Sequence, residues 1–204
     1  MAQRERQGLV RTMADAGPDA PTLCGEWTVR DLAAHLIVRE RRLDAAPGIM
    51  LKPFAARLEK VMHKVAQRPF PDLLGKVRTG PPFYLRPLDS LMNLIEMFVH
   101  HEDVRRGAPG WEPRELPSAD EDRLWKGLKG LAARKAYRSS PVTVVLATPD
   151  GRRVVAHQAG ARTVVLTGLP SELLLHAFGR NEVRLEASGA PEDVETVHAL
   201  NRSV

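Results

Sequence analysis

The chain has 204 residues, a net charge of +5 and a single cysteine, and 43% of its residues are hydrophobic and 27% charged. This composition is typical of a soluble globular protein with one large domain or two small ones, and a single cysteine excludes an internal disulfide. No apolar run approaches the roughly 20 residues that span a membrane, and residues 1–11 are too polar for a secretory signal. We therefore expect a cytoplasmic protein without membrane contact.

The positive charge is spread along the chain and forms only short clusters, for example at residues 39–42 and 105–106. Aromatic residues make up 5% of the chain, so stacking of side chains on nucleic-acid bases has little support. No nucleotide-binding, serine-hydrolase or paired-cysteine motif is present in the sequence. We predict no nucleic-acid partner, whereas anionic small molecules suit this charge.

The first half of the chain predicts helices separated by glycine and proline. Helices are expected over residues 3–16, from the capping residue Thr28 to about residue 45, and over residues 54–66 and 88–106. The stretch 69–82 is rich in proline and glycine and is expected to form a long loop at the edge of a cleft. Four helices with one long connection predict a four-helix bundle, whose core commonly holds metal sites.

The chain changes character near residue 112, so we expect an α+β protein with two domains, residues 1–112 and 113–204. In the second domain, strands 142–147 and 153–156 are joined by a turn at Asp150 and Gly151. The remaining elements predicted there are helices over residues 120–134, 172–178 and 191–200 and strands over residues 163–167 and 183–187.

Glu96 and His100 are the first candidates for a metal site. They lie four residues apart in one predicted helix, which places both side chains on the same face. His35 is the best candidate for a third ligand, because it lies at the edge of the apolar face of the Thr28 helix. Two histidines and one carboxylate are typical of catalytic zinc sites and also serve non-haem iron.

The spacing leaves an ordinary alternative open. Leu91, Ile95 and Phe98 lie opposite Glu96 and His100, so a simple amphipathic helix would place both candidate ligands in solvent. Several neighbouring residues have two interpretations each. Asp103 and Asp31 could orient His100 and His35 or be solvated charges. Cys24, four residues before Thr28, could be a reactive thiol near the helix N-terminus, but it is expected to be a small packed residue.

Two half-motifs resemble the DinB-like, mycothiol-dependent maleylpyruvate isomerase family. They are residues 27–36, WTVRDLAAHL, and residues 93–103, NLIEMFVHHED. Residues 167–180, TGLPSELLLHAFGR, are more loosely similar to the smaller C-terminal domain of that family, which is related to sterol-carrier-protein folds. The resemblance implies a DinB-like four-helix bundle followed by this α/β domain. It also implies a divalent metal bound by His35, Glu96 and His100, with zinc as the first choice and nickel or iron as alternatives.

The family's activities imply a thiol-dependent isomerase or S-transferase that uses mycothiol or another low-molecular-weight thiol on a small electrophile. A metal-bound thiol is deprotonated and becomes a nucleophile, so Cys24 is not needed for this chemistry. Arg39 is predicted to help bind the thiol and Arg180 to act on a carboxylate in catalysis. The alternative is a non-catalytic metal- or thiol-binding protein that uses the bundle for sensing or partner contact. A monomer or a homodimer is expected.

Overall fold

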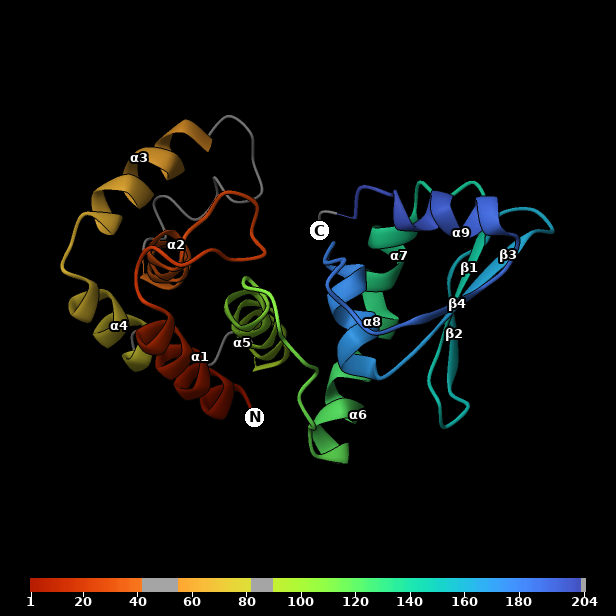
Figure 1. The fold of residues 1–204 in the computed structure, drawn as a ribbon, viewed down its shortest axis with the longest axis horizontal. Helices are drawn as coiled ribbons and strands as arrows, with labels where there is room; N and C mark the ends of the chain where they lie inside the picture. The colour runs from red at the N-terminus through yellow and green to blue at the C-terminus, as the bar shows by residue number, and fades with distance from the viewer. Residues whose placement is uncertain (42–54, 82–89, 203–204) are drawn as a thin grey trace. The chain divides into compact units, whose positions relative to one another are not determined.

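The computed structural model describes residues 1–41, 55–81 and 90–202, and it divides into two compact units, Met1–Trp111 and Glu112–Val204 (Figure 1). The described residues contain helices in both units and a four-stranded sheet in the second, which confirms the α+β class. Among them no helix is both long and apolar enough to cross a membrane. The predicted helical residues 42–45, 54 and 88–89, and residue 82 of the predicted loop, lie outside the described part of the chain.

The first unit is built from helices. They are α1 (Ala2–Ala16), α2 (Val29–Arg41), α3 (Ala55–Ala66), α4 (Phe70–Thr79) and α5 (Ser90–Arg105). Helix α1 packs along α5, while α2 packs against α3 and α4 (Figure 1). Helix α2 is buried on nearly all sides, and its side chains Leu32, Leu36 and Val38 are fully excluded from solvent in the common core.

Helix α4 corrects the expectation of a long loop over residues 69–82. Pro71 lies in the first turn of the helix, where its missing N–H group costs nothing. Leu73, Leu74 and Val77 then recur at helical spacing and are buried. Gly80, with φ of 69°, ends the helix. Proline and glycine therefore mark the ends of a helix here, not a loop.

A buried ion pair joins three helices of the first unit. The guanidinium of Arg6 on α1 donates hydrogen bonds to both carboxylate oxygens of Glu40 on α2 and, over 2.8 Å, to the carbonyl of Val77 on α4. Both charged side chains are less than 10% exposed. Removal of one partner of such a pair leaves an uncompensated buried charge, so the pair specifies how α1, α2 and α4 pack.

The second unit begins with α6 (Ser118–Gly127), which continues through a π-helical segment, Leu128–Ala132, into α7 (Ala133–Tyr137). The sequence predicts one continuous helix over residues 120–134, but Gly130 interrupts it with φ −84° and ψ −138°. Glycine tolerates this conformation because it has no Cβ. The unit also contains α8 (Pro170–Ala177) and α9 (Pro191–His198).

The sheet has the strand order β2-β1-β3-β4. Strand β1 (Thr143–Ala147) pairs antiparallel with β2 (Arg153–His157) and parallel with β3 (Thr163–Thr167), close to the predicted bounds. The fourth strand was wrongly placed at residues 183–187, since β4 is only Glu186–Ser188. The N–H group of Arg184 donates instead to the carboxylate of Glu172 over 2.8 Å, so strand pairing begins two residues later.

His176 on α8 is fully buried in the second unit. The hydroxyl of Tyr137 donates a hydrogen bond to its Nδ1 over 2.6 Å, and its Nε2 has no partner among the described residues. Burial and the nearby positive charge of Arg202 lower the pKa of His176 to about 3. The folded state therefore holds this ring neutral well below the pH at which the unfolded chain protonates it.

We expect His176 to make the second unit sensitive to acid. Because the unfolded ring binds a proton near pH 6.5 and the folded ring does not, the free energy of unfolding falls as the pH is lowered from 7 towards 3. Between pH 7 and pH 5 this amounts to about 2 kcal/mol. Denaturant unfolding followed by circular dichroism should show a smaller loss for His176→Gln than for wild type, and an equal loss in both would contradict this.

Gly8 on α1 leaves room for the ring of His101, and a Cβ at this position would lie 2.6 Å from Cε1 of His101. The ring cannot easily move aside, because it is hydrogen-bonded to Glu5 and Thr12 at 3.0 Å each. Close packing of α1 on α5 therefore requires glycine here.

We expect Gly8→Ala to lower the free energy of unfolding by about 1–3 kcal/mol, because the overpacked methyl group outweighs the gain in helix propensity. Gly75 in α4 provides the matched control, since a Cβ there meets nothing within 4 Å. Gly75→Ala should raise the free energy of unfolding by up to about 1 kcal/mol. Denaturant unfolding of both variants tests the contrast, and equal shifts of the same sign would refute it.

Candidate metal centre

His35 is positioned by the capped N-terminus of α2. The hydroxyl and the backbone N–H of Thr28 both donate to the carboxylate of Asp31, at 2.7 and 3.0 Å, as in a capping box. His35 follows one turn later and is 8% exposed. The predicted cap is confirmed. The interpretation of Asp31 as a partner of His35 is wrong, since Nε2 of His35 faces Glu96 and its Nδ1 has no hydrogen-bond partner among the described residues.

Glu96 and His100 are positioned by α5, which is buried almost all around. Ile95 and Phe98 on one side are at most 4% exposed, yet His100 on the other side is only 8% exposed. The alternative of a simple amphipathic helix with His100 in solvent is therefore wrong. Glu96 is the more open of the two, with a side chain that is 20% exposed.

The side chains of the three predicted ligands lie close together. Oε1 of Glu96 lies 3.6 Å from Nε2 of His35 and 3.2 Å from Nε2 of His100. One potential ligand atom from each residue lies within 4.8 Å of the other two. The rings of His35 and His100 approach edge to face, with centroids 5.4 Å apart.

These separations fit a divalent metal. Bonds of about 2.0–2.2 Å at tetrahedral angles place neighbouring donor atoms about 3.3–3.6 Å apart. The two measured carboxylate–imidazole separations, 3.6 and 3.2 Å, are close to this range. Nε2 is the nitrogen of His35 that faces Glu96, and Nδ1 is buried without a hydrogen-bond partner among the described residues.

The charges in the site are tightly coupled. Burial alone would raise the pKa of Glu96, but hydrogen bonds from His100 and His35 outweigh it and the pKa lies well below its usual value. Burial would lower the pKa of His100, yet its hydrogen bonds to Asp103, Cys24 and Glu96 raise it well above the usual value. Burial lowers the pKa of His35. The site thus favours an ionised carboxylate beside one cationic and one neutral imidazole.

Arg39, one turn after His35 on α2, belongs to the same cluster. Its Nε lies 3.0 Å from Oε1 of Glu96, and its Nη1 donates to the side-chain oxygen of Asn93 over 3.2 Å. The side chain is 23% exposed. The structure therefore places the predicted thiol-binding residue directly beside the candidate ligands.

Asp103 is a partner of His100, as one of its two interpretations predicted. Nδ1–H of His100 donates to Oδ2 of Asp103 over 2.8 Å, and the carboxylate is completely buried. This contact leaves Nε2 of the ring directed at Glu96. A carboxylate on the far nitrogen is the usual way in which a ligand histidine is oriented.

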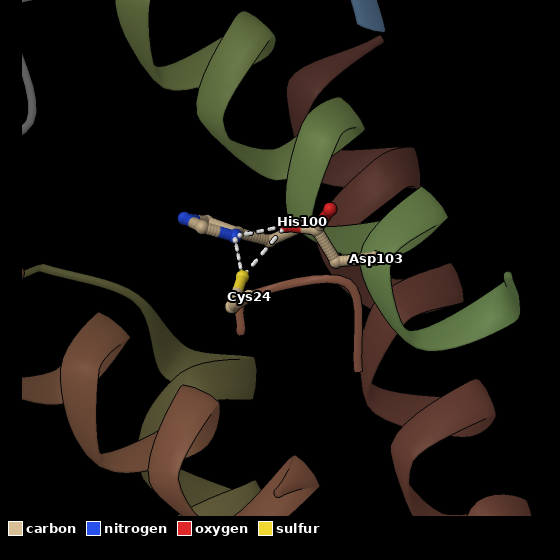
Figure 2. Close-up of side chains that lie close together, drawn as sticks. All are labelled: Cys24, His100 and Asp103. Carbon is tan, nitrogen blue, oxygen red and sulfur yellow. Dashed lines mark hydrogen bonds and ion pairs between the residues drawn. The ribbon is translucent and has the colours of Figure 1, made fainter. Parts of the chain in front are cut away.

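Cys24 is the residue whose place sequence reasoning missed. It packs against the core as expected, but its thiol also donates a hydrogen bond to Oδ2 of Asp103 over 3.0 Å and lies 3.7 Å from Nδ1 of His100 (Figure 2). Cys24 and Asp103 are 79 residues apart in the chain. No local pattern in the sequence could have indicated this contact.

Arg180 lies in the second unit, three residues after the end of α8 and directly after Gly179, where φ is 86°. Its guanidinium donates to the carbonyl oxygen of Phe178. The side chain lines a hollow of about 450 Å³ formed with residues 178–181 and 198–202. The structure brings His35, Glu96, His100 and Arg39 together in the first unit, and the predicted role of Arg180 toward them stays a prediction.

A comparison with protein families finds a match for the first part of the chain. Residues 2–80 match the family model described as "Mycothiol maleylpyruvate isomerase N-terminal domain". The match confirms the resemblance and includes α1, α2 and His35, whereas Glu96 and His100 lie beyond its end and join the centre through the fold.

Two curated proteins show a shorter similarity. The chain is 36% identical over 74 residues to "Mitochondrial import inner membrane translocase subunit TIM50" of Candida glabrata and to the protein of the same name from Eremothecium gossypii. The matched segment is 36% of this chain but spans only 14% and 15% of those proteins. No solved structure matches the chain significantly. Similarity over so small a part of the translocase subunits carries no function to this chain.

Proposed function

We propose that His35, Glu96 and His100 bind one divalent metal ion, with zinc as the first choice and nickel or iron as alternatives. The observation that carries the proposal is the convergence of one carboxylate oxygen and two imidazole nitrogens from α2 and α5 at metal-ligand separations. The match of residues 2–80 to the mycothiol-related family model adds support. In this proposal the first unit is a DinB-like bundle, and the second is an α/β module related to sterol-carrier-protein folds.

The reaction we propose is the thiol-dependent isomerisation of a small electrophile or the transfer of a thiol to it, with mycothiol or another low-molecular-weight thiol as cofactor. His35, Glu96 and His100 would hold the ion and leave room for a further ligand, and the bound ion would lower the cost of forming a thiolate from the thiol. Asp103 holds the His100 ring by its Nδ1–H group and so keeps Nε2 directed towards the centre. A reduced thiol is available in the cytoplasm, where we propose that the protein acts as a monomer or homodimer.

The two arginines have separate proposed roles. Arg39 uses two of its N–H groups on Glu96 and Asn93, and we propose that further donors of the guanidinium bind a carboxylate of the thiol. Arg180 lines its hollow in the second unit, and we propose that it acts in catalysis by pairing with a carboxylate. A charge-assisted hydrogen bond of this kind contributes about 1.5–3 kcal/mol, or roughly ten- to a hundredfold in affinity.

We expect the purified protein to bind about one divalent ion per chain, as three convergent ligands imply. His100→Asn is the informative variant, since an asparagine amide can replace Nδ1–H toward Asp103 but offers nothing in place of Nε2. Its metal affinity should fall by more than the roughly 10–100-fold that follows loss of a residue hydrogen-bonded to a metal ligand. Metal analysis after dialysis measures this. The exposed His63 provides the control, and equal metal content in His100→Asn, His63→Asn and wild type would rule out the centre.

Turnover of a reporter electrophile is expected only when both a divalent metal and a thiol are present. His35→Asn should abolish turnover, because it removes a ligand, and His63→Asn should retain it. Steady-state assays that omit metal or thiol in turn provide the measurement. Metal-dependent thiol binding without turnover of any electrophile would instead support the non-catalytic sensing or partner-binding alternative.

A further inference from the structure

Cys24 has no part in the proposed centre, although it lies against the far side of one of its ligands. Its Sγ is 3.0 Å from Oδ2 of Asp103 and 3.7 Å from Nδ1 of His100 (Figure 2). Together these residues provide one sulfur, one oxygen and one nitrogen donor within 4.8 Å of one another. Asp103 and His100 are buried, whereas Cys24 is partly exposed.

The loop that carries Cys24 is held in place by backbone contacts. The hydroxyl of Thr22 accepts a hydrogen bond from the N–H of Cys24 and donates one to the carbonyl of Trp27. The N–H of Leu23 donates to the carbonyl of Asp103 over 3.1 Å. The loop also approaches the end of α5 so closely that a Cβ at Gly107 would lie 2.2 Å from the carbonyl oxygen of Pro21. The position of the thiol is therefore fixed against α5.

We propose that Cys24, Asp103 and Nδ1 of His100 form a second site, for a divalent cation more thiophilic than zinc, such as cadmium. Thiolate, imidazole and carboxylate are known metal ligands, and their bond lengths to zinc provide a test of the geometry. Tetrahedral bonds of about 2.3 Å to sulfur and 2.0–2.1 Å to nitrogen place these two atoms about 3.6 Å apart, and the measured separation is 3.7 Å. The carboxylate oxygen must move outward by about half an ångström, and the thiol proton is released to solvent as the ion binds.

Charge favours this second site for a cation. A thiolate and a carboxylate together neutralise a divalent ion, which lowers the cost of holding it in a buried place. The first site offers one carboxylate, and the guanidinium of Arg39 lies 3.0 Å from the same oxygen of that carboxylate. Compared with the first site, the site beside Cys24 therefore offers a soft cation a more suitable donor atom and a better charge balance.

The two sites compete for one imidazole. A neutral ring has a single lone pair, so His100 binds a metal either through Nε2, with Nδ1–H donated to Asp103, or through Nδ1, with Nε2–H donated to Glu96. Both hydrogen-bond partners are in place, at 2.8 and 3.2 Å. The second site rests on the proposed function only because the two sites share His100. A thiophilic ion bound beside Cys24 therefore displaces the metal of the first site.

Cobalt(II) is a suitable probe, because coordination by a thiolate produces a charge-transfer absorption that nitrogen and oxygen ligands do not produce. Cys24 is the single cysteine of the chain, so any such band can be assigned to it. In thiol-free buffer, Glu96→Gln, which removes the carboxylate of the first site alone, should bind cobalt with this band. The double variant Cys24→Ser/Glu96→Gln should lack the band and bind cobalt at least about tenfold more weakly. His35→Asn is the substitute for Glu96→Gln if that variant does not fold.

A second readout is the rate at which iodoacetamide alkylates Cys24. Cobalt and cadmium should slow alkylation of Glu96→Gln at least tenfold, because the thiolate is then a ligand. Cobalt binding by Glu96→Gln without the band, or alkylation that the ion does not slow, would overturn the second site, as would no binding at all. Cobalt binding by Cys24→Ser tests the first site separately, so failure of one site can be told from failure of the other.

Discussion

The hydrogen bonds of His100 to two carboxylates of its own helix are the interaction on which the candidate centre depends. Glu96 lies one turn before it and Asp103 almost one turn after it, so α5 alone holds the ring from both sides. These contacts oppose the desolvation of the ring and raise its pKa. Because both ring nitrogens are engaged, whatever else binds at either nitrogen must replace a proton, and the neighbouring residues determine the nitrogen at which this occurs.

The residues around the ring are arranged as two unlike environments. On the Nε2 side, α2 brings His35 and Arg39, a neutral donor and a cation, to Glu96. On the Nδ1 side, a short loop brings a thiol to a carboxylate that is completely buried. One side of the imidazole therefore faces a carboxylate and a guanidinium, and the other faces a carboxylate and a thiol. If both proposals hold, metal identity and thiol chemistry are coupled through this one side chain.

Other contacts in the first unit fix the positions of α2 and α5. The capping box of Thr28 and Asp31 sets where α2 starts, and the Arg6–Glu40 pair with Val77 ties its far end to α1 and α4. Helix α1 can pack closely on α5 because Gly8 makes room for the His101 ring. The ring of His101, next to His100 in sequence, is thereby kept on the opposite side of the helix with Glu5 and Thr12. Two adjacent histidines thus have separate surroundings.

Local chemistry in the sequence was sufficient to predict much of this. The spacing of Glu96 and His100 specifies one helix face, Thr28 and Asp31 specify a helix start, and β1, β2 and β3 follow from β-branched runs and a turn at Asp150 and Gly151. Local patterns failed at α4, because its proline and glycine residues indicate a loop. They also failed at β4, because the N–H group of Arg184 donates to Glu172 and not to a neighbouring strand. Only tertiary structure decided that His100 is buried, that Arg39 reaches Glu96 and that Cys24 contacts Asp103. The physical reason is that helix and strand periodicity depend on neighbours within a few residues, whereas these contacts join segments more than 50 residues apart, and only packing of the whole core fixes them.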